Sequence, residues 1–315
     1  MRRVSSKTAA AGILVLAQQN GAGAQDLFYS LEGAFTSSAD EHRFFVSVPA
    51  GLASFDETRF LTWHHGGGTN LAGDAIAAGS FDPKLRLLDS GGALVAANDD
   101  RFTGFILDAQ IVAPGLAEDT YELIMDVQSG AVGGPWALDL LGDAGTEIKL
   151  RADDTAGSGS TIGSLKFGSR NAGTAQIRVA DGASLTVNGA ISVAHIGFDG
   201  LPSSANLTSS SGGQVSAVDV DIAPGPGSTS ALSLITGIGS ILDVSNNFTV
   251  GQTGSAQFLI LNDAVVTVAD QATVGSGGTL RLQDGTLRAG TLHHSSGGIF
   301  TITGGASRPE RSTAT

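Results

Sequence analysis

The sequence predicts an all-β protein built from an antiparallel β-sandwich followed by a short parallel β-helix, or solenoid. Three observations support this class. Apolar residues alternate with a period of two in short segments, clusters of turn residues separate the segments, and no segment shows a long helical period. After residue 150, weakly similar segments recur at a spacing of roughly 25 residues, which lies within the range of solenoid repeats.

The composition indicates how large a core the chain can form and which classes of partner it can bind. Of 315 residues, 41% are hydrophobic, which is enough apolar material for a sizeable core. The formal net charge of −13 repels phosphate backbones and anionic lipid, so nucleic-acid binding is not expected. Because the sequence contains no cysteine, disulfides, thiolate zinc sites, iron–sulfur clusters and cysteine nucleophiles are excluded.

The segment 1–24 has the features of a signal peptide. Arg2, Arg3 and Lys7 form a basic start, residues 8–17 form an apolar run, and Ala22-Gly23-Ala24 is a small-x-small cleavage pattern. We therefore expect export, with a mature chain that starts at Gln25; a short helix or a disordered start is the alternative. No later stretch is long and apolar enough to be a membrane helix.

Residues 25–150 are expected to form the β-sandwich. Alternation with a period of two places one set of side chains on a buried sheet face. The residues of this set are Phe44, Val46, Val48, Leu85, Leu87, Ala109, Ile111, Tyr121, Leu123, Met125, Trp136, Leu138 and Leu140. Turn residues lie between these strands, and Asp89-Ser90-Gly91-Gly92 is expected to be only a hairpin turn.

Residues 151–305 are expected to form the solenoid, and residues 306–315 a disordered tail. In the copy that begins at Gly173, three strands are expected, around Ile177, Leu185 and Ile191. Asp181-Gly182 supplies a corner, where positive φ is tolerated. One copy cannot bury its own apolar face, so copies must stack with strands about 4.8 Å apart. A second antiparallel sandwich is the alternative.

The N-terminal half also resembles a known family. The segment AGSFDPKLRLLDSGGALVAANDD, which ends at Asp100, the pair Asp108-Ala109 and the strand around Tyr121 are similar to exported bacterial sandwich domains related to pre-peptidase C-terminal domains. Glu118 and Asp119 stand where that family has a glycine. The resemblance covers about 100 residues, and it implies a jelly-roll-like, non-catalytic accessory domain of secreted and surface proteins.

The second half resembles the repeats of autotransporter passengers and related adhesins, although this likeness is looser. The segment Pro309-Glu310-Arg311-Ser312-Thr313 is similar to the Pro-Glu-Pro signal for surface sorting, with Arg311 in place of the second proline. The apolar helix and basic tail that follow this signal are missing from the sequence given. Chance similarity and a reading frame that is cut short are equally open explanations.

Four oxygen-bearing residues are candidate metal ligands: Asp82, Asn98, Asp99 and Asp100. Two loops that meet at one end of a sandwich can offer the six to eight oxygens that Ca²⁺ prefers. Ca²⁺ is therefore the one candidate cofactor. The alternative is that these residues initiate and cap turns through local bonds between side chain and backbone.

Catalytic chemistry has weak support in the sequence. Asp219 and Asp221 share one strand face, but a hydrolase needs carboxylates clustered at a fixed separation, and no third partner is evident. The pairs His64-His65 and His293-His294 are expected to be polar side chains at the surface. No nucleophile elbow, zinc-binding H-E-x-x-H motif or phosphate-binding loop occurs.

These features together predict an exported, non-catalytic surface or extracellular-matrix protein of a Gram-negative bacterium. In this interpretation the sandwich is the recognition module and the solenoid is a spacer, with a structural and adhesive role. The expected partners are polysaccharides or proteins of the cell surface or matrix, and the periplasm is the alternative location. The competing hypothesis is a carbohydrate-active enzyme, a polysaccharide lyase or hydrolase, that acts on the β-helix face near Asp219 and Asp221.

Overall fold

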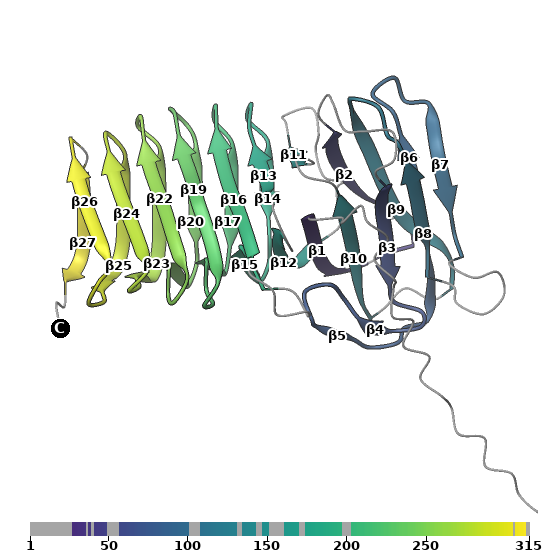
Figure 1. Ribbon diagram of the computed structural model, residues 1–315, viewed down its shortest axis with the longest axis horizontal. Helices are drawn as coiled ribbons and strands as arrows, with labels where there is room; N and C mark the ends of the chain where they lie inside the picture. The colour runs from purple at the N-terminus through teal and green to yellow at the C-terminus, as the bar shows by residue number, and fades with distance from the viewer. Residues whose placement is uncertain are drawn as a thin grey trace, which may run out of the picture.

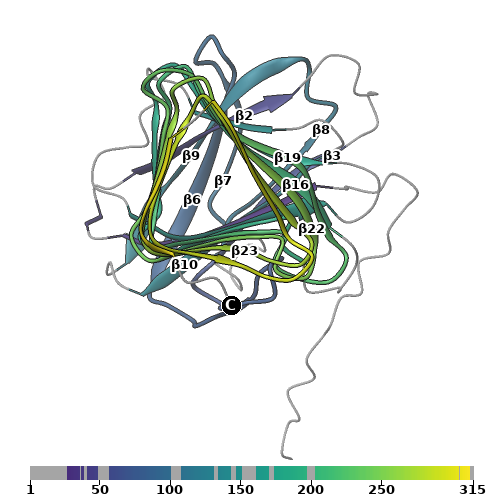
Figure 2. The ribbon, with the colours of Figure 1, turned by 90° about the vertical axis from the view of Figure 1, so that its left-hand side faces the viewer.

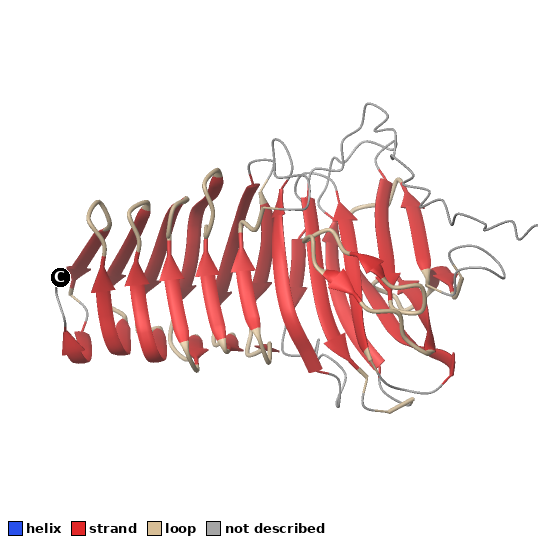
Figure 3. Cartoon of the chain, turned by 90° about the horizontal axis from the view of Figure 1, so that it is seen from below, coloured by secondary structure: helices blue, strands red, loops and turns tan. Residues whose placement is uncertain are grey.

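The computed structural model describes residues 27–35, 37–38, 41–48, 57–100, 108–130, 134–142, 147–150, 161–169, 174–196, 203–304 and 306–312. Every regular element in these ranges is a β-strand, and no helix occurs in them (Figures 1 and 3). The predicted all-β class is therefore confirmed. The predicted signal peptide, residues 1–24, and the predicted mature start at Gln25 lie outside the described residues.

Strands β1 to β10 form the N-terminal half. They are β1 (Leu27–Ala34), β2 (Glu41–Val48), β3 (Glu57–Trp63), β4 (Gly68–Thr69), β5 (Ala75–Ile76), β6 (Phe81–Leu88), β7 (Leu94–Asn98), β8 (Gln110–Pro114), β9 (Asp119–Gly130) and β10 (Pro135–Gly142). All pairings among these strands are antiparallel. The alternating residues that the sequence assigns to the core are all buried here, and they belong to one continuous hydrophobic core. The jelly-roll arrangement of this half stays a prediction.

The strands after β10 build the solenoid. They are β11 (Glu147–Leu150), β12 (Thr161–Ser169), β13 (Ala175–Val179), β14 (Ser184–Thr186), β15 (Ala190–Val193), β16 (Ser203–Ser210), β17 (Gln214–Ala217), β18 (Asp219–Ile222), β19 (Ser228–Thr236), β20 (Ile241–Val244), β21 (Asn247–Val250), β22 (Ser255–Leu261), β23 (Val265–Val274), β24 (Gly278–Gln283), β25 (Thr286–His294), β26 (Ile299–Thr303) and β27 (Ala306–Ser312). Coils of three strand segments stack along one axis to give about five turns, and each coil is triangular in cross-section (Figure 2).

Neighbouring coils pair in parallel throughout, so the predicted parallel solenoid is confirmed and the antiparallel alternative is wrong. Like positions stack on like positions. One inward row consists of Leu185, Val215, Leu242, Val266 and Leu287, each buried and each in register with the next. Because one coil cannot cover its own apolar face, these rows hold the coils together.

The coils become shorter toward the C-terminus. Ile177 pairs with Leu207 of the next coil, whereas Leu280, nearer the C-terminus, pairs with Phe300. The number of residues between paired positions is therefore smaller in the C-terminal coils. The repeat spacing expected from the sequence lies between these two values. Asp181 and Gly182 form a corner with φ of 56° and 81°, as the sequence predicts.

Two long sheets run from one half into the other. In the first, β1 pairs antiparallel with β12, which pairs in parallel with β15. In the second, β2 pairs antiparallel with β11, which pairs in parallel with β13. The backbone hydrogen bonds therefore continue across the predicted boundary at residue 150, and the two halves form one elongated body (Figure 1).

Two expectations from the sequence differ from the structure. Residues 306–315 are expected as a disordered tail, but Ala306–Ser312 form β27, which pairs in parallel with β25 and thereby continues the solenoid. His64 is expected at the surface but is fully buried. Its ring stacks on that of Phe81 with centroids 3.5 Å apart, and its Nδ1 lies 2.7 Å from the Pro135 carbonyl oxygen, so its role is in packing.

Candidate functional site

A polar face runs along the solenoid over β15, β18, β21 and the C-terminal halves of β23 and β25. Its outward side chains form two parallel rows because each strand is in register with the next. The first row is Ala190, Asp219, Asn247, Gln271 and Thr291. The second row is Ser192, Asp221, Thr249, Thr273 and His293.

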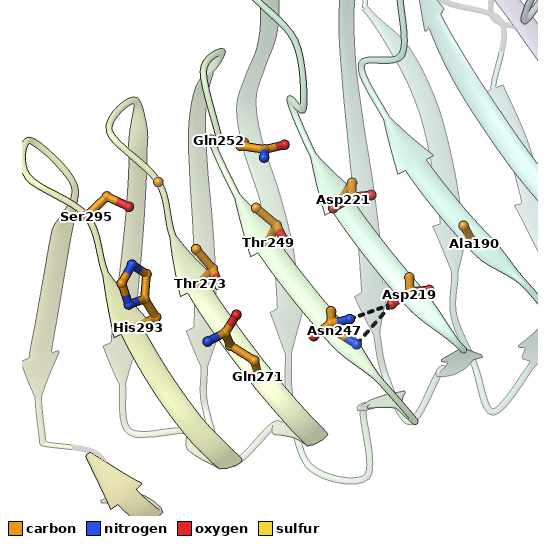
Figure 4. Close-up of a pocket in the computed structure, with 11 residues that line it drawn as sticks. Ala190, Asp219, Asp221, Asn247, Thr249, Gln252, Gln271, Thr273, His293 and Ser295 are labelled. Atoms are coloured by element: carbon orange, nitrogen blue, oxygen red, sulfur yellow. Dashed lines mark hydrogen bonds between the residues drawn. The ribbon is translucent and has the colours of Figure 1, made fainter. Parts of the chain in front are cut away.

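All residues of these rows except Ser192 and Thr291 line a groove with a volume of about 540 Å³ (Figure 4). The corner that follows each strand supplies the rest of its wall, through Gln252, Gly275 and Ser295. Side chains of successive coils lie side by side along the groove, with Asp219 and Asp221 toward one end and His293 toward the other (Figure 4). The groove therefore crosses several coils and follows the solenoid axis.

Asp219 is held in place by hydrogen bonds from the next coil. Its Oδ1 accepts hydrogen bonds from Asn246 Nδ2 at 2.8 Å, from the Asn247 backbone N–H at 3.0 Å and from Asn247 Nδ2 at 3.2 Å. Three donors therefore converge on this one oxygen. The amides thus fix the position of Asp219 in the wall of the groove.

Asp221, two residues later on β18, has a different environment. Burial raises the pKa of the Asp221 carboxyl above its ordinary value, the nearby Asp219 charge adds to this effect, and a hydrogen bond with Thr249 opposes it. The Asp221 side chain is therefore more readily protonated than an ordinary aspartate. Two carboxyl groups on one strand face can support binding of a cation.

The groove combines hydrogen-bonding groups with a negative charge. Its lining residues supply hydroxyls, side-chain amides, two carboxyls and one imidazole, and include no lysine or arginine. Of these residues, sequence reasoning singled out only Asp219 and Asp221 for chemistry. The sequence does contain a signal for the others, because two of its similar segments end in Val250-Gly251 and Val274-Gly275. Aligning these segments places Thr249 beside Thr273 and Asn247 beside Gln271.

The candidate calcium ligands lie in the N-terminal half, on β6, on β7 and directly after β7. Leu85 of β6 pairs with Asn98 of β7, and Asp82 lies on β6 shortly before Leu85. Asn98 Oδ1 is buried and accepts no hydrogen bond from the described residues, so the local bond expected of a turn cap is not made by this atom. This oxygen fits a metal ligand.

The described part of the chain does not bring a complete set of metal ligands together. Asp99 and Asp100 follow Asn98, and the adjoining residues 101–107 lie outside the described ranges. No group of three or more histidine, aspartate or glutamate side chains within those ranges could hold a metal ion. In contrast, the neighbouring turn is as predicted, because Asp89 Oδ1 accepts hydrogen bonds from the backbone N–H groups of Gly91 and Ala93.

No protein-family model matches this chain, and no curated protein is significantly similar to it. Among the described residues, no helix is long and apolar enough to cross a membrane.

Proposed function

We propose that this chain is an exported, non-catalytic structural protein of the surface or extracellular matrix of a Gram-negative cell, with an adhesive role. The observation that carries this proposal is the continuity of the two sheets from the N-terminal half into the solenoid. Hydrogen bonds that run unbroken along the molecule make a stiff spacer, which can hold a recognition module away from a surface.

The N-terminal half is proposed to be a jelly-roll recognition module. Its main strands form two groups of four, in the orders β1-β10-β3-β8 and β2-β9-β6-β7. An eight-stranded double sheet with Greek-key connections has this organisation. The strand order thus supports the resemblance to exported accessory domains, whose partners are polysaccharides or proteins of the surface or matrix.

The composition of the solenoid face supports a non-catalytic role. Asp219 and Asp221 are the carboxylates that line the groove, and neither a third acid nor a lysine or arginine is among its lining residues. Polysaccharide hydrolases on such a face need carboxyl groups at a fixed separation on both sides of the scissile bond. The groove offers one such pair, on the single strand β18.

The test is expression of the full chain in a Gram-negative host, followed by cell fractionation and N-terminal sequencing. We expect the protein outside the cytoplasm, with Gln25 as its first residue. Cells that display it should adhere to matrix-coated surfaces more strongly than cells that display an unrelated solenoid. Recovery of the intact chain, with residues 1–24 attached and confined to the cytoplasm, would refute the proposal.

A carbohydrate-active enzyme is the second candidate, and the pair of carboxyl groups in the groove favours it. The raised pKa of the Asp221 carboxyl suits a general acid, and hydrogen bonds from Asn246 and Asn247 hold the Asp219 carboxyl in a fixed position. This candidate predicts that the protein releases reducing ends or unsaturated products from a polysaccharide and that D221N abolishes the release. If no polysaccharide of a broad panel yields products, the enzyme candidate is rejected and the structural role is retained.

A further inference from the structure

We propose that the groove over β18, β21, β23 and β25 binds an extended polysaccharide that carries protonated amino groups, such as a partly deacetylated glucosamine polymer. The proposed function gives the solenoid the role of a spacer, and this inference adds a binding site on one of its faces. If no glycan binds, the spacer role is unaffected.

The shape of the groove favours a long, thin ligand. The groove follows the solenoid axis, and each row supplies one side chain per coil, at a repeat of about 4.8 Å. This repeat is close to the length of one hexose unit in an extended glycan. A polysaccharide chain that lies along the axis can therefore place successive sugars against equivalent side chains of successive coils.

The chemistry of the lining favours a sugar over a peptide or a lipid. Thr249, Thr273 and Ser295 offer hydroxyl groups, and Asn247 and Gln271 offer amides that both donate and accept. No large aliphatic, phenyl or indole side chain lines the groove, whereas peptide and lipid sites depend on apolar pockets. Sugar hydroxyl and acetamido groups match this set of hydrogen-bonding partners.

The charge of the groove selects among glycans. Asp219 and Asp221 are two carboxyl groups near one end, the lining contains no lysine or arginine, and the whole chain has a net charge of −13. Uronate and sulfate polymers are therefore repelled, whereas an ammonium group of an amino sugar gains a charge-assisted hydrogen bond. Asp221 is the principal partner proposed for this group because three hydrogen bonds from Asn246 and Asn247 converge on Asp219 Oδ1, whereas Asp221 has a hydrogen bond with Thr249 alone among the groove residues.

The site is also rigid before the ligand arrives. Its side chains stand on strands whose inward residues, among them Val220, Phe248 and Ala272, are fully buried. The hydrogen bonds to Asp219 hold the end of the groove in one arrangement. Preorganised side chains reduce the entropy lost on binding, so moderate contacts with each sugar can sum to specific recognition.

Isothermal titration calorimetry of the full chain tests this inference with three hexasaccharides of different charge. The probes are a glucosamine hexamer with free amines, a neutral glucose hexamer and a galacturonate hexamer. We expect the amine hexamer to bind most tightly, the neutral hexamer about tenfold more weakly, and the galacturonate hexamer not at all. D221N should weaken binding of the amine hexamer about tenfold, while circular dichroism shows that the variant is folded.

D243N is the matched control, because Asp243 is an exposed aspartate on β20, on another face of the same coil as Asn247. It makes the same charge change outside the groove and should leave binding unchanged. The inference fails if the amine hexamer does not bind to the folded protein, if the galacturonate hexamer binds equally well, or if D221N and D243N have the same effect.

Discussion

The Lys166 ammonium nitrogen lies 2.6 and 2.7 Å from the two carboxylate oxygens of Asp74. Lys166 is on β12 at the start of the solenoid, and Asp74 is in the loop between β4 and β5. Near this pair, His195 Nε2 lies 3.1 Å from the Ala72 carbonyl oxygen. The loop from the N-terminal half is thus fastened to the solenoid by side chains, in addition to the two shared sheets.

Lys166→Met should weaken this junction. The substitution keeps the aliphatic stem but removes both charge-assisted hydrogen bonds to a partly buried carboxylate. Because the pair is partly exposed to solvent, we expect a loss of about 1–2 kcal/mol in the free energy of unfolding. Urea denaturation measures the free energy of unfolding. Arg281→Met on the distant strand β24 is the control for removal of an exposed cation. Equal stability of both variants would show that the pair contributes nothing.

Glu32 gives the junction a dependence on pH. Burial, a hydrogen bond with Asp74 and the Asp74 charge raise the pKa of Glu32 above its ordinary value of 4.5. A carboxyl whose pKa is raised in the folded state stabilises the protein below its ordinary pKa, and this contribution is lost as the pH rises through the folded-state pKa.

Glu32→Gln should therefore remove the loss of stability that accompanies ionisation of Glu32, because an amide donates a hydrogen bond at every pH. We expect the variant to gain stability relative to the wild type between pH 4 and pH 7. Burial raises the pKa of Asp74, but hydrogen bonds with Lys166 and Glu32 outweigh burial, so that this pKa is lowered. The stability that Asp74 contributes is therefore lost only as the pH falls below its ordinary pKa of 3.8, outside this range. Thermal melting at both pH values measures the difference. A constant difference across this range would contradict the prediction.

Phe248 is a packing residue of the solenoid core. It is fully buried, and its ring meets that of Phe258 edge to face with centroids 4.8 Å apart. We expect Phe248→Ala to cost about 3–5 kcal/mol because it leaves a cavity between two sides of the triangle. Phe248→Leu, which keeps most of the volume, should cost less than about 2 kcal/mol in the same denaturation experiment. Similar small losses for both variants would argue against a tightly packed interior.

The predicted calcium site at Asp82, Asn98, Asp99 and Asp100 has a direct test. An ion that binds only the folded state raises the melting temperature in a concentration-dependent way. We expect Ca²⁺ to do so in the full chain and Asp100→Asn to reduce the effect, with Mg²⁺ as the control ion. A titration with neither heat nor a change in melting temperature would dispose of this site and leave these residues as turn formers.

Those parts of the fold that depend on local pattern were predictable from the sequence. The buried positions from Phe44 to Leu140, the three strands around Ile177, Leu185 and Ile191, and the corner at Asp181 all follow from alternation and turn chemistry. The recurring similar segments then predicted the stacking of the solenoid coils, because equivalent residues of successive copies share the same surroundings.

The remaining features depend on contacts between distant residues. The pairing of β1 with β12 joins the first described strand to one beyond the predicted domain boundary, and no local pattern specifies it. The buried His64 ring contacts Phe81 and the Pro135 carbonyl oxygen, both from distant segments, and Asp108 accepts hydrogen bonds from the backbone N–H groups of His64 and His65. Of the residues in the groove, the sequence pointed only to the face near Asp219 and Asp221. The threonine and amide side chains beside them are recognised once the register between coils is known.

The most direct test of the stacked parallel coils is disulfide cross-linking in this cysteine-free chain. Asp243 is in register with Thr267 of the next coil, and Thr267 with Arg288 of the coil after that. The D243C/T267C pair should form a disulfide under mild oxidation, because adjacent strands lie about 4.8 Å apart. The D243C/R288C pair spans two coils and should stay reduced. Cross-linking of the second pair but not the first, detected by mass spectrometry after proteolysis, would contradict the parallel stack.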